Sequence, residues 1–178
     1  MEFLIALITE GMRCMKQSQS VELIGKEAAT LIGLKWEGTF AEAGAGGIRE
    51  VQTEFKLRLH EIGNVMHPDE LLGLSYHVTE IGFVHYVAVQ VDDVASSSVP
   101  EGMVQFKIPA HDYAKYSHIK GESIESSYHQ IYAWIEEQGL RLSNEPLTHY
   151  EVYPMEQDSN DHEPEFSIFV PINKKKLE

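Results

Sequence analysis

The sequence predicts one α+β domain, in which two β-α-β-β units form an antiparallel sheet with both helices on one face. Two segments have apolar residues at helical spacing, and short segments rich in β-forming residues surround them. The order strand, helix, strand, strand occurs twice, over about residues 28–92 and 103–172. We expect a central ligand groove between these halves, on the sheet face opposite the helices.

The helices are predicted at residues 48–62 and 124–138, because apolar side chains there fall on one helical face. Ser123 is a suitable N-cap for the second helix, and Gly139 is a suitable residue to end it. The apolar stripes consist of Ile48, Val51, Phe55, Leu59 and Ile62 in the first helix and of Ile124, Tyr128, Ile131 and Ile135 in the second.

Short segments rich in β-branched and aromatic residues predict the strands, and turn-forming residues separate them. The glycine-rich run 44–47 lacks the spacing of a phosphate-binding loop and its lysine. We interpret it as a flexible connection, with a mobile lid beside the groove as the alternative. The predicted strands are 29–36, 72–77, 83–91, 103–108, 113–118, 148–153 and 166–171.

The charge and the ends of the chain restrict its environment. A formal net charge of −14 at pH 7 repels phosphate backbones, so we expect no direct nucleic-acid binding. The one cysteine favours a reducing compartment, and the apolar run at 3–8 is too short to span a membrane. We therefore expect a cytoplasmic protein, with residues 1–27 as an N-terminal extension. Residues 175–178 are interpreted as a tail that ends in a vector remnant.

Several segments follow one another in an order that resembles one known family. They are residues 86–91, 99–103, 108–114, 120–121, 131–135, 150–153 and 166–172. Together they resemble the GyrI-like superfamily, which includes the effector-binding domains of AraC- and MerR-type regulators. The resemblance covers residues 28–174 and implies a duplicated β-α-β-β fold with a central pocket. In the regulators a helix-turn-helix domain precedes this fold. Here about 27 residues do, so we expect a stand-alone effector-binding domain without a DNA-binding domain.

The resemblance also implies a glutamate at the pocket floor, and the matching residue is Glu151. Strand alternation places His149, Glu151 and Tyr153 on one face and Tyr150 and Val152 on the other. If the second face packs under the helices, Glu151 points into the groove. A carboxylate among aromatic rings attracts organic cations, and burial would raise its pKa and suit it to acid/base chemistry. The alternative is an ordinary solvated glutamate on a strand.

Aromatic side chains are candidates for the wall of the groove. We favour Trp36, Tyr86 and Tyr153 over Tyr76, and we expect Trp134 to border the site from the core. Core packing is the alternative for each of them. The nine histidines have no metal-ligand spacing, and no cofactor motif occurs in the chain, so we expect neither a metal nor a cofactor.

Three functions are compatible with this pattern. The first is a binder of small, hydrophobic and often cationic molecules that senses or sequesters drugs or toxins, or serves as a transcription-related regulator. The second is a hydrolase of reactive electrophilic toxins, in which Glu151 activates water. The third is docking of the acidic protein onto a partner, either a regulator or DNA gyrase. Binding ranks first because no second strong catalytic group accompanies Glu151. The oligomeric state is not predicted.

Overall fold

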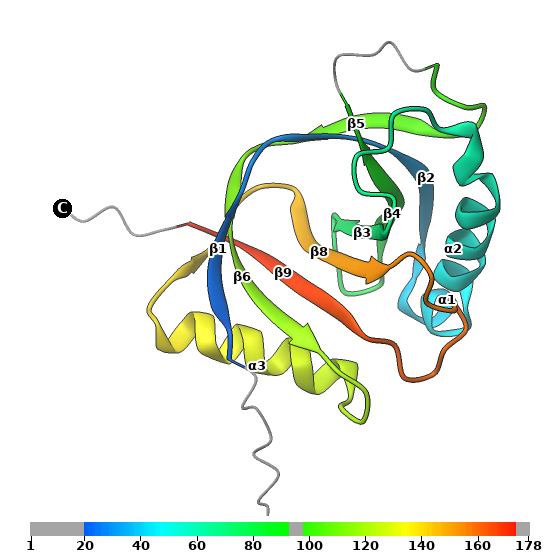
Figure 1. The fold of residues 1–178 in the computed structure, drawn as a ribbon. Helices are drawn as coiled ribbons and strands as arrows, with labels where there is room; N and C mark the ends of the chain where they lie inside the picture. Colours follow the sequence, from blue (N-terminus) through cyan, green and yellow to red (C-terminus); the bar gives the residue numbers. More distant parts are fainter. Residues whose placement is uncertain (1–19, 93–97, 174–178) are drawn as a thin grey trace, which may run out of the picture.

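The structure is a computed structural model that describes residues 20–92 and 98–173. The tail at 175–178 and most of the expected N-terminal extension therefore lie outside the described residues. The described residues form one nine-stranded sheet with three α-helices (Figure 1). Among these residues, no helix is both long and apolar enough to cross a membrane.

The elements follow one another along the chain with one long helix in each half. The strands are β1 (Glu22–Lys26), β2 (Ala29–Thr39), β3 (Glu70–Tyr76), β4 (Gly82–Val91), β5 (Val104–Ile108), β6 (His111–His118), β7 (Arg141–Leu142), β8 (Leu147–Pro154) and β9 (Phe166–Asn173). The helices are α1 (Phe40–Gly44), α2 (Gly47–Arg58), the short 3-10 helix η1 (Leu59–Glu61) and α3 (Ile124–Glu137).

The order of strands in the sheet confirms the α+β class and the duplication. The order is β1-β6-β9-β8-β3-β4-β2-β5, and β7 pairs with β9. The first unit contains β2, α2, β3 and β4, and the second contains β6, α3, β8 and β9. From the centre of the sheet outward, the first unit runs β3-β4-β2 and the second runs β8-β9-β6. Each unit thus places its second, third and first strands in the same order.

The end signals of the second long helix act as the sequence predicts. The Ser123 side chain accepts a hydrogen bond from the backbone N–H of Ser126 and caps α3. Gly139 follows the helix with a φ of 62°, a conformation that side chains other than glycine rarely adopt. These signals explain why α3 begins and ends within a residue of the predicted range.

The first long helix differs slightly from its predicted range. The segment 48–62 is divided between α2 and η1. The short helix α1 was not predicted. It is stabilised by a capping box, in which Thr39 accepts from the Glu42 backbone while the Glu42 carboxylate accepts from the Thr39 backbone. The glycine-rich run therefore connects α1 to α2, and Gly46 turns the chain with a φ of 115°.

Both faces of the curved sheet bury apolar side chains, and α2 and α3 cover the same face (Figure 1). The helix-bearing face has one cluster under α2, with Ile32, Leu34, Val87 and Phe55, and one under α3, with Ala114, Tyr116, Ile168 and Ile131. The opposite, concave face buries a third cluster that includes Leu31, Leu72, Leu74, Ala88, Tyr113, Tyr150 and Phe169. The expected helix placement on one face is thus confirmed.

The edge strand β1 was not predicted. It pairs with β6 in the register that places Ile24 opposite Tyr113, so the sheet begins at Glu22 rather than after the expected extension 1–27. The strand is short, and residues such as Leu23 remain exposed. Most of its side chains are exposed and Gly25 has no side chain, so the segment gives a weak alternation signal.

Candidate functional site

Small residues at the centre of β3 leave space on the helix-bearing face of the sheet. Leu71 belongs to the cluster under α2, so alternation places Gly73 and Ser75 on the same face. Leu72 and Leu74 are buried on the opposite face. Because Gly73 has no side chain and Ser75 has a short one, the sheet is not filled here as it is beneath the two long helices.

Polar side chains from the neighbouring strands border this space. Gly73 is paired with Glu151 of β8, and Ser75 is paired with His149 of β8 and His85 of β4. Directly paired residues of antiparallel strands point to the same face of a sheet. One carboxylate and two imidazoles therefore surround the small residues of β3.

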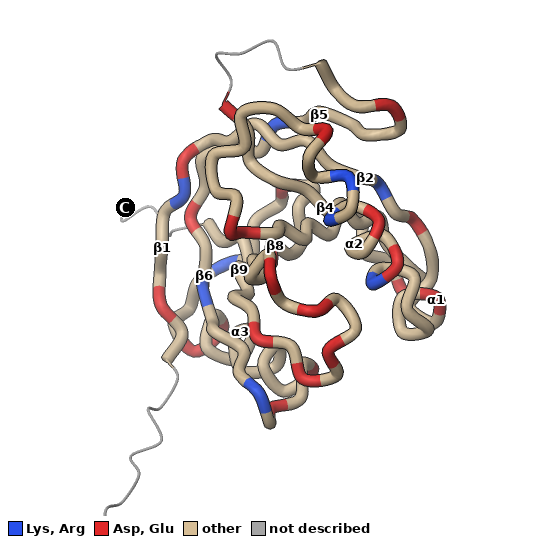
Figure 2. The backbone as a smooth tube through the Cα atoms, turned by 45° about the vertical axis from the view of Figure 1, so that its right-hand side comes forward, with Lys and Arg blue, Asp and Glu red and all other residues tan. Residues whose placement is uncertain are grey.

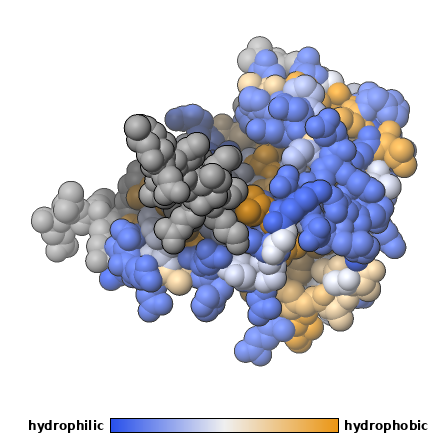
Figure 3. All heavy atoms as spheres, turned by 60° about the horizontal axis from the view of Figure 1, so that its bottom comes forward, coloured by the Kyte–Doolittle hydropathy of each residue, from blue (hydrophilic) through white to orange (hydrophobic). Residues whose placement is uncertain are grey.

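A cavity of about 460 Å³ lies above these residues, between α1, the start of α2 and the first turn of α3. A cavity of this size suits a small organic ligand. Seen from the side of α3, the surface includes hydrophobic areas among mostly hydrophilic ones (Figure 3). The apolar part of the cavity wall consists of Phe40, Ile48, Val78, Phe83, Ile124 and Phe166.

Glu151 is held at the floor of the cavity by two tyrosines. The Tyr128 hydroxyl donates to Glu151 Oε1, and the Tyr153 hydroxyl donates to Oε2 at 3.0 Å. Burial raises the pKa of the Glu151 carboxyl, while the two hydrogen bonds act in the opposite direction. Burial and the nearby carboxylate raise the pKa of both tyrosines, so they remain hydrogen-bond donors at neutral pH.

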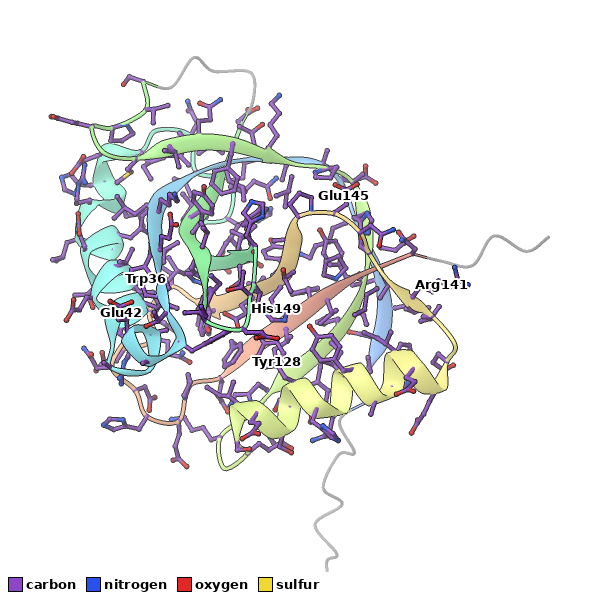
Figure 4. All side chains as sticks on the ribbon, turned by 180° about the vertical axis from the view of Figure 1, so that it is seen from behind. Trp36, Glu42, Tyr128, Arg141, Glu145 and His149 are labelled. Carbon is purple, nitrogen blue, oxygen red and sulfur yellow. The ribbon has the colours of Figure 1, made fainter. Side chains whose placement is uncertain are left out.

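Both histidines of the cavity are neutral near pH 7. Burial lowers the pKa of His85 to about 4 and that of His149 to about 4. The Nδ1 atom of His85 is 3.0 Å from the Ser75 hydroxyl, and the Tyr132 hydroxyl is 2.6 Å from Nε2 of His149. Figure 4 shows Tyr128 and His149 side by side between α3 and the sheet, and their ring centroids are 4.8 Å apart.

The cavity contains a negative group without a basic neighbour in its wall. Among the described residues that line it, Glu151 is the only acidic one, and none is Lys or Arg. Arg49 and Lys56 line an adjoining cavity of about 310 Å³ together with Asp158 and Asp161. The chain as a whole has 28 acidic and 14 basic residues, and acidic positions outnumber basic ones along the backbone (Figure 2). The surrounding field therefore favours the approach of cations.

The structure brings Glu151 and Tyr153 together in this cavity, but not the other aromatic residues that we named. Trp36 does not line the cavity and packs behind its wall, with its ring 5.3 Å from that of Phe83. Tyr76 and Tyr86 lie on the opposite face, where their rings make an edge contact at 5.5 Å. Trp134 packs in the cluster under α3.

The expected side of the groove was wrong. We expected the groove on the sheet face opposite the helices, which Glu151 would enter if Tyr150 and Val152 packed under the helices. Instead Tyr150 and Val152 belong to the cluster on the concave face, and Glu151 points toward the helices. Both faces of the sheet are covered, so the apolar character of Tyr150 and Val152 did not reveal which face carries the helices.

Sequence reasoning missed Tyr128, His85 and His149 as site residues. Tyr128 lies on the apolar stripe of α3 and was interpreted as core. The histidines come from separate strands, and only the pairing of β4, β3 and β8 brings them together. One available signal was the pair Gly73 and Ser75, two small residues on one face of an otherwise leucine-rich strand. Within the described part of the chain, no three His, Cys, Asp or Glu side chains gather closely enough to hold a metal ion.

Comparison with known proteins identifies the family of this fold and cavity. The family model described as GyrI-like small molecule binding domain matches residues 19–173. The chain therefore belongs to the GyrI-like family, and the resemblance seen in the sequence is confirmed.

The relatives differ in how much of their length this domain accounts for. Transcriptional regulator BrlR of Pseudomonas aeruginosa is 30% identical over 128 residues, which cover 70% of this chain and 45% of that protein. The chain thus spans less than half the length of this relative. The structure of SAV2435 bound to tetraphenylphosphonium has a TM-score of 0.65 at 16% identity, covering 86% of this chain and 94% of that one. The C-terminal domain of EcmrR has a TM-score of 0.66 at 15% identity, with coverages of 89% and 99%. At these identities the two structures show a shared fold.

Proposed function

We propose that the protein binds small hydrophobic cations in the cavity between α1, α2 and α3, with Glu151 as the counter-charge. The observation that carries this proposal is the partly desolvated Glu151 carboxylate, which lies in an aromatic and aliphatic cavity without a basic side chain in the described wall. A bound cation would restore the electrostatic stabilisation that burial removes from the carboxylate.

The surroundings of Glu151 favour a cation that is also hydrophobic. Tyr128 and Tyr153 fix the carboxylate in place, so little conformational entropy would be lost on binding. Tyr153 stacks on Phe166 with ring centroids 4.6 Å apart, and Phe40 and Phe83 lie 5.2 Å apart in the wall. Aromatic faces attract cations and shield the ion pair from water.

The relatives support the same ligand class. SAV2435 has been solved with tetraphenylphosphonium, a hydrophobic cation, and BrlR is a transcriptional regulator. We propose that ligand binding by this chain serves the sensing or sequestration of drugs or toxins.

The proposal is tested by isothermal titration calorimetry with tetraphenylphosphonium and the neutral triphenylphosphine oxide. We expect Glu151→Gln to weaken the cation about 30-fold or more, because loss of a buried charge partner costs about 2 kcal/mol or more. The affinity for the neutral compound should change less than about threefold, since it makes no ion pair. The control Glu145→Gln removes the same charge at an exposed position away from the cavity (Figure 4) and should bind as the wild type does. Equal losses for both compounds in Glu151→Gln would contradict the proposal.

Hydrolysis of a reactive electrophile is the second candidate, favoured by the raised pKa of Glu151. In that reaction Glu151 would take a proton from a water molecule as the water oxygen bonds to an epoxide carbon and the epoxide C–O bond breaks. The proton would then pass to the released alkoxide oxygen, which gives the diol and restores the carboxylate. Incubation with styrene oxide followed by mass spectrometry tests it. Formation of the diol by the wild type, and not by Glu151→Gln, would establish turnover. Recovery of the unchanged epoxide from both proteins would count against it.

A further inference from the structure

Two hydrogen-bond acceptors that line the cavity, Glu151 and His85, lie beside Gly73. A Cβ atom at Gly73 would lie 3.2 Å from Glu151 Oε2 and 3.2 Å from His85 Nε2. Glu151 comes from β8 and His85 from β4, the two strands that flank β3. We call the space above Gly73, bordered by these two side chains, the Gly73 niche. Because Gly73 has no side chain, these two side chains can lie close over β3, where a Cβ would crowd them and would come within 3.1 Å of His85 Cε1.

His85 presents an unpaired nitrogen to the niche. The side chain is 2% exposed and lines the cavity, and its Nε2 atom has no hydrogen-bond partner among the described residues. Its other nitrogen, Nδ1, lies 3.0 Å from the Ser75 hydroxyl. When Nδ1–H donates to Ser75, Nε2 is an acceptor. A buried nitrogen without a partner is unfavourable, so a ligand that supplies a donor gains more than it would in water.

We propose that the Gly73 niche is a subsite for a ligand N–H group, so that the cavity selects primary or secondary ammonium groups over quaternary ones. One N–H would donate to Glu151 Oε2 and another to His85 Nε2, while the hydrophobic part of the ligand lies against the aromatic wall. A nitrogen with four carbon substituents has no hydrogen to donate, and its substituents keep it away from both acceptors. This inference rests on the proposed function, since it names the kind of cation that the same cavity takes.

Hydration opposes the proposed preference for primary over quaternary ammonium ions. A primary ammonium holds its water more strongly than a quaternary ammonium, so an apolar cavity alone favours the quaternary ion. A preference for the primary ion therefore requires protein groups that replace the lost water. The charge of Glu151 attracts either ion, whereas His85 Nε2 can form a hydrogen bond only with an ion that has an N–H group. Selectivity between the two ions thus reports on the niche rather than on the charge.

The test is a calorimetric titration with 2-naphthylmethylammonium, its N,N,N-trimethyl derivative and tetraphenylphosphonium. We expect the wild type to bind the primary ion at least about tenfold more tightly than its trimethyl derivative, from charge-assisted hydrogen bonds. Gly73→Ala fills the niche, and His85→Phe removes the acceptor, so each should reduce the preference to about threefold or less. Tetraphenylphosphonium reports any general loss of cation affinity in each variant, and the preference is the ratio of the two naphthylmethyl affinities within the same variant.

Gly25→Ala is the matched control. Gly25 lies on the edge strand β1, and a Cβ there would make only an ordinary contact of 3.5 Å with Asp112 of β6, so this variant should keep the full preference. Thermal unfolding of each variant shows whether it folds. If Gly73→Ala does not fold, His85→Phe alone tests the niche. No preference in the wild type, or a preference that persists in Gly73→Ala or His85→Phe, would overturn the niche while cation binding stands. Failure of all three cations to bind the wild type would instead overturn the proposed function.

Discussion

The two halves of the molecule share one architecture but contribute different chemistry to the cavity. The first unit supplies Ser75 of β3 and apolar wall residues such as Ile48 and Phe83. The second unit supplies Glu151 and Tyr153 from β8, and Tyr128 from α3. The duplicated fold therefore explains why there is space between the helices, and the difference between the halves explains which groups line that space.

The same comparison separates stability from recognition. Each unit buries one apolar cluster under its own long helix, and Tyr153 packs against both clusters. We therefore expect the halves to contribute similarly to the stability of one cooperative domain, while ligand affinity depends mostly on the second half. His85 of β4 is the main exception, because it brings a polar group from the first unit into the site.

The largest expected effect concerns the stability shared by the halves. Phe55 of α2 and Ile131 of α3 are fully buried. We expect Phe55→Ala to lower the free energy of unfolding by about 3–5 kcal/mol and Ile131→Ala by about 2–5 kcal/mol, each in a single urea transition followed by circular dichroism. Leu57→Ala, at a position that is 73% exposed, is the control and should change it by less than about 0.5 kcal/mol. Two separate transitions, with each variant shifting one of them, would show that the halves unfold independently.

The next effect is the acid sensitivity of the buried His85. Burial lowers its pKa to about 4 in the folded protein, against 6.5 as the ordinary value. Between these values the unfolded chain binds a proton that the folded protein does not, so stability falls as the pH falls from 6.5 toward 4. The difference between the two pKa values of His85 corresponds to a total loss of about 3 kcal/mol in the free energy of unfolding. Urea unfolding of His85→Phe should show a smaller loss of stability between pH 7 and pH 4.5 than the wild type shows.

A control for the histidine prediction is His129→Gln, which changes an exposed histidine on α3. It should retain the pH dependence of the wild type. If His85→Phe retained the same dependence as well, the buried imidazole would not be the cause. His149, whose pKa is also lowered to about 4, should then be changed in the same way.

The smallest expected effect distinguishes tyrosines on the two faces of the sheet. Tyr153→Phe removes a donor that lowers the pKa of Glu151, so the carboxyl is protonated more easily and tetraphenylphosphonium binding should weaken about three- to tenfold. Tyr86→Phe alters a hydroxyl on the concave face and should change the affinity less than about twofold. Fluorescence titration of both variants measures the difference. An equal loss in both would mean that the cavity near Glu151 is not where the cation binds.

Local signals and element order were sufficient to predict much of the fold. Ser123 and Gly139 marked the ends of α3, and the repeated order of elements predicted the two units and the helices on one face. The edge strand β1 and the short helix α1 were missed because neither has a long apolar stripe. Their positions depend on pairing with β6 and on the Thr39 capping box.

The site was less accessible from sequence because it is made by strand pairing. Glu151 came from the resemblance, and Tyr153 followed from alternation along β8. Tyr76 and Tyr86 share the aromatic character of Tyr153 but lie on the concave face. The residue type alone does not indicate on which face a tyrosine lies. His85 becomes part of the site only through its pairing with Ser75.

The pH dependence of cation affinity tests most directly whether Glu151 is the counter-charge. Burial raises the pKa of Glu151 above its ordinary value, whereas both cavity histidines have a pKa of about 4 and remain neutral above pH 5. Protonation of Glu151 removes the negative charge, so the affinity of the wild type for tetraphenylphosphonium should decrease as the pH is lowered from 8 toward the raised pKa of this carboxyl. In Glu151→Gln the affinity should be weak and constant over the same range. A wild-type affinity that does not change with pH, or an equal decrease in Glu151→Gln, would contradict the assignment of Glu151 as the charge partner.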